Sequence, residues 1–168
     1  MNFLIPEPMS IEVIAERLIA KRRWCGEIPV TILGHSYAVA RDLALRGFGP
    51  EIQLQGLLHD VTEAPLPDMP TPLKPYTFVE IDGRRVSWRA YEDMWGEAML
   101  PPLGAAWPLN HEVKVSDVRA LHFEAASFPS LDWWELPEGA VWAVGMTRVF
   151  LENVTIEDFI NRYEELRE

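Results

Sequence analysis

The sequence has little cysteine, few basic residues and no long apolar run. With Cys25 as its one cysteine, an internal disulfide is excluded, and a reducing cytoplasm is the expected compartment. The apolar stretches are far shorter than the ~20 residues that span a membrane, so we expect no membrane association. The first residues carry no basic charge before their apolar stretch and no clear cleavage site, and we therefore expect no secretory signal.

The small number of basic residues argues against some classes of binding partner. There are 15 lysines and arginines against 26 acidic residues, which gives a net charge of −11. A surface of this sign repels a phosphate backbone, so we expect no nucleic-acid partner. An anionic small molecule remains possible as a substrate if a metal ion and a few local cations neutralise it.

The chain shows no internal repeat and no low-complexity linker. Its 168 residues, 48% of them apolar, suit one compact domain with a sizeable core. We therefore expect a single domain over residues 1–168.

Helical periodicity predominates, and the predicted fold class is all-α. Ser10 and Ser87 are good N-caps, and Thr155 with Asp158 resembles a capping box. Five prolines between residues 65 and 75 exclude a regular helix in that segment. A short hairpin around Asp82-Gly83 is also compatible with the sequence. The predicted helices cover about 10–22, 31–46, 50–63, 87–100, 111–128, 140–151 (where a strand is the alternative) and a last segment from 155.

Two histidines and two aspartates from three predicted helices form the main candidate site: His35, His59, Asp60 and Asp117. Imidazole nitrogens and carboxylate oxygens together suit a divalent ion and leave positions open for water and substrate. Singly, each residue has a plainer interpretation, since a histidine on a helix is more often a hydrogen-bonded structural residue. His111 and His122 belong to no motif, and we expect neither to be a ligand.

Two further carboxylates follow the His59-Asp60 pair. Glu63 is three and four residues further along, which on a helix is the same face one turn on. Asp68 lies in the proline-rich loop. A metal-activated water and a carboxylate that handles its proton, with cations such as Arg23 and Lys74 for the phosphate, would suffice for phosphoester hydrolysis. The alternative is that these are solvated surface charges.

The run GLLHDVTEAPLPDMPTPLK, residues 56–74, strongly resembles the HD superfamily of metal-dependent phosphohydrolases. It is most similar to the branch that holds bacterial 5′-deoxynucleotidases and short phage HD proteins, some of them dATP triphosphohydrolases. The resemblance implies an HD domain in which a divalent ion (Zn²⁺, Co²⁺, Mn²⁺ or Mg²⁺) is held between central helices. The implied ligands are His35, His59, Asp60 and Asp117.

The same resemblance implies roles for the other candidates. Glu63 and Asp68 match the catalytic carboxylates of the branch, and Arg23 and Trp24 match an Arg-Trp pair that shapes the nucleotide pocket. The implied reaction is hydrolysis at the 5′-phosphate of a deoxynucleotide, releasing phosphate from a dNMP or triphosphate from a dNTP. It also implies a homo-oligomer, dimer or hexamer, and, for a phage protein, the host cytoplasm.

Two rival functions remain open. One is hydrolysis of a non-nucleotide phosphoester or a cyclic dinucleotide, and the other is a non-catalytic nucleotide-binding module. A binding module has no need of the Glu63 and Asp68 pair, which disfavours it.

Overall fold

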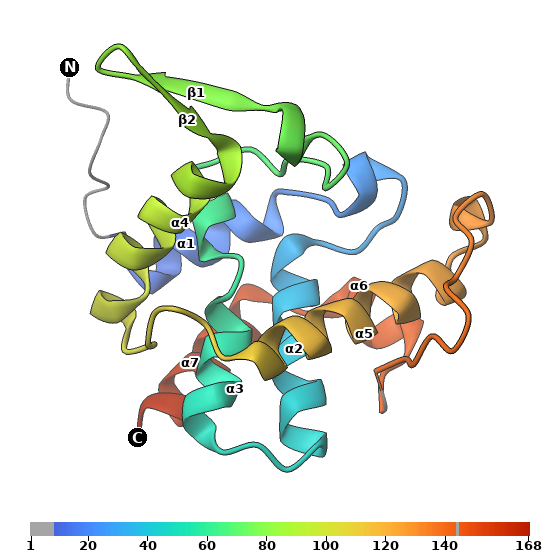
Figure 1. Cartoon of the computed structure of the whole chain (residues 1–168). Helices are drawn as coiled ribbons and strands as arrows, with labels where there is room; N and C mark the ends of the chain where they lie inside the picture. The colour runs from blue at the N-terminus through green and yellow to red at the C-terminus, as the bar shows by residue number, and fades with distance from the viewer. Residues whose placement is uncertain (1–8, 144) are drawn as a thin grey trace.

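The computed structural model describes residues 9–143 and 145–168. Helices make up 59% of the chain and strands 6%, which confirms a mostly helical fold with one small sheet added. No helix in the described ranges is long and apolar enough to cross a membrane. The elements in Figure 1 are α1 (Ile11–Ile19), α2 (Ile32–Leu45), α3 (Pro50–Leu58), β1 (Phe78–Ile81), β2 (Arg84–Ser87), α4 (Trp88–Met99), α5 (His111–Ser127), α6 (Arg148–Asn153) and α7 (Ile156–Arg167).

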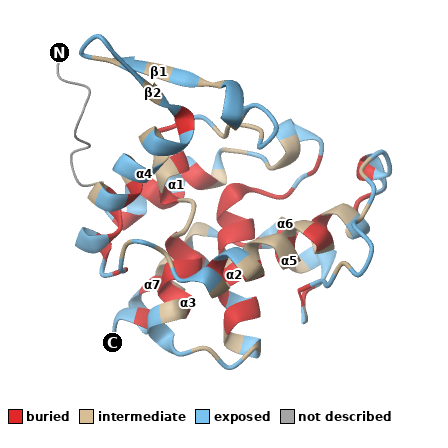
Figure 2. Ribbon diagram, in the orientation of Figure 1, coloured by how far each residue is buried: buried red, intermediate tan, exposed pale blue. Residues whose placement is uncertain are grey.

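Helix α2 is the centre of the fold and contacts α1, α3, α5, α6 and α7. Figure 2 shows buried residues along most of α2, whereas the β1–β2 hairpin is largely exposed. The main core joins α2 to α1, α3 and α7, with Leu18, Leu33, Leu57 and Phe159 fully buried in it. A central helix with neighbours on all sides can bring side chains from several of them to one place.

Local sequence accounts for where the helices begin. The side chains of Ser10, Thr31, Ser87 and Asn110 each accept a hydrogen bond from a backbone N–H in the first turn that follows. Thr155 and Asp158 form the complete capping box, so the predicted starts of these helices are confirmed.

The predicted hairpin is also confirmed. β1 and β2 pair antiparallel, with Ile81 opposite Arg84. Asp82 and Gly83, between them, have φ of 49° and 74°. Positive φ at both central residues is the requirement of the tight hairpin turn that Asp-Gly favours.

Three predicted helix boundaries are wrong, two at the end of a helix and one at the start. The helix predicted over 10–22 ends at Ile19, because the chain turns back and the N–H of Ile32 donates to the carbonyl of Lys21, 3.0 Å away. The helix predicted over 50–63 ends at Leu58, and a separate 3-10 turn, η2 (Val61–Glu63), follows it.

The helix predicted over 140–151 is the third error. Residues 140–143 and 145–147 are not helical, position 144 lies outside the described residues, and α6 begins only at Arg148. Gly139 and Gly145 adopt φ of 76° and 74°, outside the range of a right-handed helix. The described residues of this segment are irregular in conformation, and Val141 and Trp142 are exposed.

Candidate metal centre

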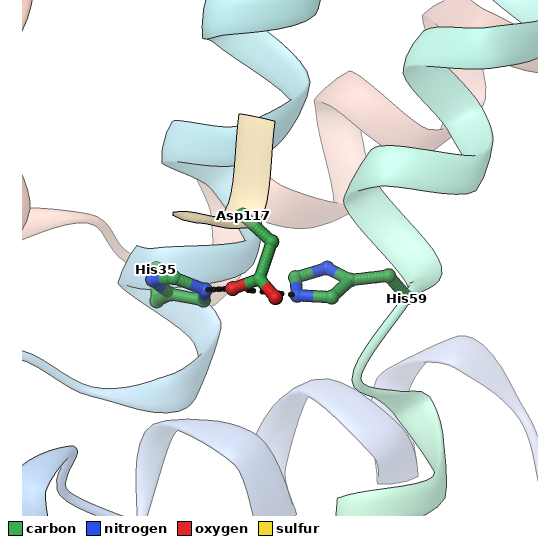
Figure 3. A group of neighbouring side chains, drawn as sticks. All are labelled: His35, His59 and Asp117. Carbon is green, nitrogen blue, oxygen red and sulfur yellow. Dashed lines mark hydrogen bonds and ion pairs between the residues drawn. The ribbon is translucent and has the colours of Figure 1, made fainter. Parts of the chain in front are cut away.

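Three of the four predicted ligands come together from three helices. His35 lies on α2, His59 is the C-cap of α3, and Asp117 lies on α5; one possible ligand atom from each lies within 4.8 Å of the others (Figure 3). Oδ1 of Asp117 is 3.0 Å from Nε2 of His35 and 3.9 Å from Nε2 of His59. Oδ2 of Asp60 is 3.1 Å from the same nitrogen of His59, so the fourth predicted ligand borders the group.

Both imidazoles are held by their other nitrogen. Nδ1 of His59 is 2.8 Å from the carbonyl oxygen of Gly56, and Nδ1 of His35 is 2.7 Å from Oε1 of Glu124. In the neutral imidazole an acceptor at Nδ1 places the proton there and leaves the Nε2 lone pair free, which is the usual arrangement of a metal-binding histidine.

The donor set fits a divalent cation. Nε2 of His59 is buried and forms no hydrogen bond of good geometry within the described part of the chain, although Oδ2 of Asp60 is 3.1 Å away. A buried nitrogen in this position calls for a partner. Around it lie Nε2 of His35 and two carboxylates, all of them electron-pair donors. Imidazole with carboxylate ligands is a set that Zn²⁺, Co²⁺ and Mn²⁺ accept.

The imidazoles and carboxylates of the centre stabilise each other's charged forms, which shifts their pKa values. Burial and Arg23 oppose the charged form of His35, but Glu124 and Asp117 outweigh them and raise its pKa to about 9. Burial raises the pKa of Asp60, but His59 more than offsets this and holds that pKa well below its usual range. The pKa of Asp117 is likewise lowered, against the effect of burial, chiefly by its hydrogen bond to His35.

Glu63 lies beside the candidate ligands without joining them. It is 7% exposed, in η2, and its Oε2 has no hydrogen-bond partner within the described residues. Burial, and then the nearby charges of Asp60 and Asp68, raise its pKa to about 9. Lys21 anchors this turn, since its Nζ donates to the backbone carbonyls of Glu63 and, at 2.6 Å, of Leu66. Lys21 is therefore engaged with the backbone.

The predicted substrate-binding residues surround the same centre. Burial lowers the pKa of Arg23, but negative charges outweigh it and raise that pKa above its usual value. These charges are those of Glu124, Asp60, Asp117 and Glu63. The charges of Glu63 and Asp60 also act on half-buried Lys74, whose Nζ is paired with Oε1 of Glu92 at 2.9 Å.

Trp24 has an unusual backbone conformation. Its φ is 55° and that of Cys25 is 53°, in the left-handed region that bulky residues rarely adopt. The turn is held because the N–H of Arg23 donates to the carbonyl of Val30 at 2.9 Å. Strain of this kind is more common at functional sites than elsewhere.

Sequence reasoning missed Glu124. It is fully buried and contacts His35, Trp24 and Arg23. One signal was present in the sequence, because Glu124 follows Asp117 by seven residues, two helical turns along the same face.

An ionic group also fixes α5 against α2 and so sets the position of Asp117. The carboxylate of Asp42, fully buried on α2, accepts hydrogen bonds from Arg119 Nε at 2.9 Å, Arg119 Nη2 at 3.1 Å and Ser116 Oγ at 2.8 Å. Arg119 and Ser116 flank Asp117 in sequence. The placement of Asp117 opposite His35 therefore depends on this contact between the helices.

The other histidines lie outside the group. His111 is the exposed first residue of α5, and the ring of His122 contacts that of Trp134 at 6.0 Å between centroids. Both line a pocket of about 430 Å³ between α5 and the 137–141 loop. One of its lining residues, Lys114, contacts the metal centre, since its Nζ is 2.5 Å from Oδ2 of Asp117.

Comparison with known proteins gives no function. No family model matches the chain. The chain is similar to an uncharacterized protein of Rhodobacter capsulatus, with 32% identity over 137 residues. The match covers 74% of this chain and 66% of the relative, so the chain spans just under two thirds of the length of that protein.

Proposed function

We propose that the protein is a divalent-metal-dependent phosphohydrolase of the HD kind, acting at the 5′-phosphate of a deoxynucleotide. The observation that carries this proposal is the convergence of two imidazole Nε2 atoms with Asp117, each imidazole held at Nδ1 by an acceptor. The spacing of Glu63 and Asp68 after the His59-Asp60 pair supports the HD assignment over other metal sites.

His35, His59, Asp60 and Asp117 would hold the ion. A divalent ion bound there lowers the pKa of a water molecule and polarises a phosphoryl oxygen. The protein's own contribution is to fix the ligands, through Gly56 and Glu124 at the imidazoles and through Asp42 behind α5.

Glu63 is the residue proposed to move the proton. One oxygen of its buried carboxyl has no hydrogen-bond partner among the described residues, and the carboxyl lies close enough to Asp60 for the two charges to interact. A cation held at Asp60 would offset the negative charge that raises the pKa of Glu63, and the ionised carboxylate would then accept the proton of the attacking water as the phosphoester is cleaved. Asp68 acts beside it and assists the leaving oxygen. A module that only bound nucleotides would gain nothing from burying Glu63 in this way.

Arg23 and Lys74 are the proposed phosphate contacts. Both cations lie within the electrostatic reach of Glu63 and Asp60, so a phosphate attacked there is close to positive charge. Trp24 is proposed to contact the nucleoside and to select the deoxyribose. A homo-oligomer, dimer or hexamer, belongs to the same proposal, as does action in the cytoplasm, of the host if the protein comes from a phage.

A substrate panel tests the proposal. Metal-free protein is reloaded with Zn²⁺, Co²⁺, Mn²⁺ or Mg²⁺ and incubated with each dNMP, dNTP and ribonucleotide, and the products are separated by chromatography. Nucleoside with triphosphate identifies a dNTP triphosphohydrolase, and nucleoside with orthophosphate identifies a 5′-deoxynucleotidase. Failure to hydrolyse any of them with any of these metals contradicts the proposed substrate class.

A further inference from the structure

Glu124 joins two parts of the site that are separate in sequence. Its Oε1 accepts a hydrogen bond from Nδ1 of the candidate ligand His35, at 2.7 Å. Its Oε2 accepts one from the indole Nε1 of Trp24, at 2.8 Å, and lies 3.4 Å from Nε of Arg23. One carboxylate therefore links the Trp24 indole to the imidazole.

The chemistry of this contact requires a carboxylate. Both His35 Nδ1–H and Trp24 Nε1–H are donors, and an ionised carboxylate accepts from both. The charge of this fully buried carboxylate is balanced by Arg23, whose Nε lies 3.4 Å from Oε2. A glutamine of the same shape has one acceptor oxygen and one donor amide, so it can satisfy only one of the two partners.

Trp24 is restrained on its other sides as well. Its ring meets those of Trp134 and Trp133 edge-on, with centroids 5.4 and 6.3 Å away. Its backbone is held in the left-handed region. Because the indole has little freedom to move, the loss of its Nε1–H hydrogen bond should alter the position of the Glu124 carboxylate.

We propose that Glu124 is a positioning residue that couples the Trp24 indole to the metal ligand His35, so that the contact made by Trp24 sets metal affinity. The coupling rests on the proposed function for the metal at His35 and for the substrate-facing role of Trp24. It adds that binding of the nucleoside against Trp24 and binding of the ion are linked, because both act on one carboxylate.

The test is a double-mutant cycle on metal affinity. Dissociation constants for Zn²⁺ and Mn²⁺ are measured by chelator competition, without substrate, on the wild type, Glu124→Gln, Trp24→Phe and the double variant. Trp24→Phe keeps an aromatic ring and removes the N–H. The control for it is Trp88→Phe, because Nε1 of buried Trp88 has no partner within the described residues. The control for Glu124→Gln is Glu112→Gln, which alters a different ion pair of α5, with Arg46.

We expect Glu124→Gln to weaken metal binding by roughly 10- to 100-fold, as for other partners of metal-bound histidines. Trp24→Phe is expected to weaken it less, and the loss should largely vanish in the Glu124→Gln background. Both controls should bind as the wild type does. If Glu124→Gln does not fold, as judged by circular dichroism, the metal affinity of Trp24→Phe compared with that of Trp88→Phe still tests the coupling.

Three outcomes would overturn the coupling: full metal affinity in Trp24→Phe, multiplicative losses in the double variant, or no metal binding by the wild type. The last also removes the proposed function. Coupled metal binding without hydrolysis of any nucleotide would leave Glu124 as a positioning residue and remove only the proposed substrate class. The two proposals can therefore fail separately.

Discussion

Nε2 of His35 lies 3.0 Å from Oδ1 of Asp117, although 82 residues separate them in the chain. Neutral His35 has its proton at Nδ1, toward Glu124, and then both of these atoms carry lone pairs. Two acceptors at this distance are stable together only if a proton or a cation lies between them. Protons and divalent ions should therefore compete for the site.

Metal binding should stabilise the protein. At a free Zn²⁺ or Mn²⁺ concentration 100 times the dissociation constant, the gain is about 2.7 kcal/mol. For a chain of this length, that corresponds to a rise in Tm of roughly 5–10 °C, measurable by differential scanning calorimetry. Asp117→Asn should lose most of the rise because it removes a charged ligand.

Asp93→Asn is the matched control. Asp93 is exposed on α4, outside the group formed by His35, His59 and Asp117, so its variant should keep the full rise. An equal rise in Tm for Asp117→Asn and the wild type would contradict the metal assignment.

Glu63→Gln should separate metal binding from turnover. The change keeps the shape of the side chain but removes its capacity to accept the proton. We expect metal content, measured by atomic absorption, to stay at the wild-type level while kcat falls by roughly 100- to 10,000-fold. Glu97→Gln, at an exposed position of α4, should retain full activity. A Glu63→Gln variant that still turns over at the wild-type rate would rule out this role for Glu63.

The metal-free protein should lose stability as pH rises from about 6.5 to 9. The pKa of His35 is raised from 6.5 to about 9 and that of Glu63 from 4.5 to about 9, so the folded state holds more protons than the unfolded state in this range. The stability that these protons provide is fully present below the unfolded pKa and is lost as pH passes the folded pKa. Urea unfolding in the presence of a chelator measures the change.

Glu63→Gln divides this pH effect between the two groups. The variant should keep the His35 part, above pH 6.5, and lose the Glu63 part, which begins at lower pH. A free energy of unfolding that stays constant or rises between pH 6.5 and 9 in the metal-free wild type would contradict the raised pKa values of both His35 and Glu63.

The starts of most helices were predictable because they depend on residues a few positions apart; the start of α6 is the exception. Ser10, Ser87 and the Thr155–Asp158 capping box act within one turn of their own helices. The ends were harder to predict. α1 ends just before Lys21. The backbone carbonyl of Lys21 accepts a hydrogen bond from Ile32, and the side chain of Lys21 donates one to the carbonyl of Leu66. Contacts with such distant segments leave no local pattern.

The residues of the candidate site also differ in how far the sequence could predict them. The pair His59-Asp60 with Glu63 could be selected because these residues lie close together in the chain. The role of Glu124 could not, because it depends on how α5 crosses α2 and on a turn that places Trp24 at φ of 55°. Neither the crossing nor the left-handed turn has a signature in the residues themselves.

Gly56 should be one of the least replaceable small residues, because α3 lies close against α2 there. A Cβ at this position would lie 2.4 Å from Cδ1 of Leu43 and 3.4 Å from the backbone of Ala40. Gly56→Ala should therefore reduce the free energy of unfolding by about 1–3 kcal/mol, the usual cost of overpacking, as measured by urea denaturation.

The same substitution should also weaken metal binding, because the carbonyl of Gly56 accepts the hydrogen bond that orients His59. Gly49→Ala is the control, since Gly49 precedes the same helix with φ of −69° and a Cβ there would meet nothing within 4 Å. It should cost less stability and leave metal affinity unchanged. If Gly56→Ala were no more costly than Gly49→Ala, the close approach of α2 and α3 would not be what positions His59 beside Asp117.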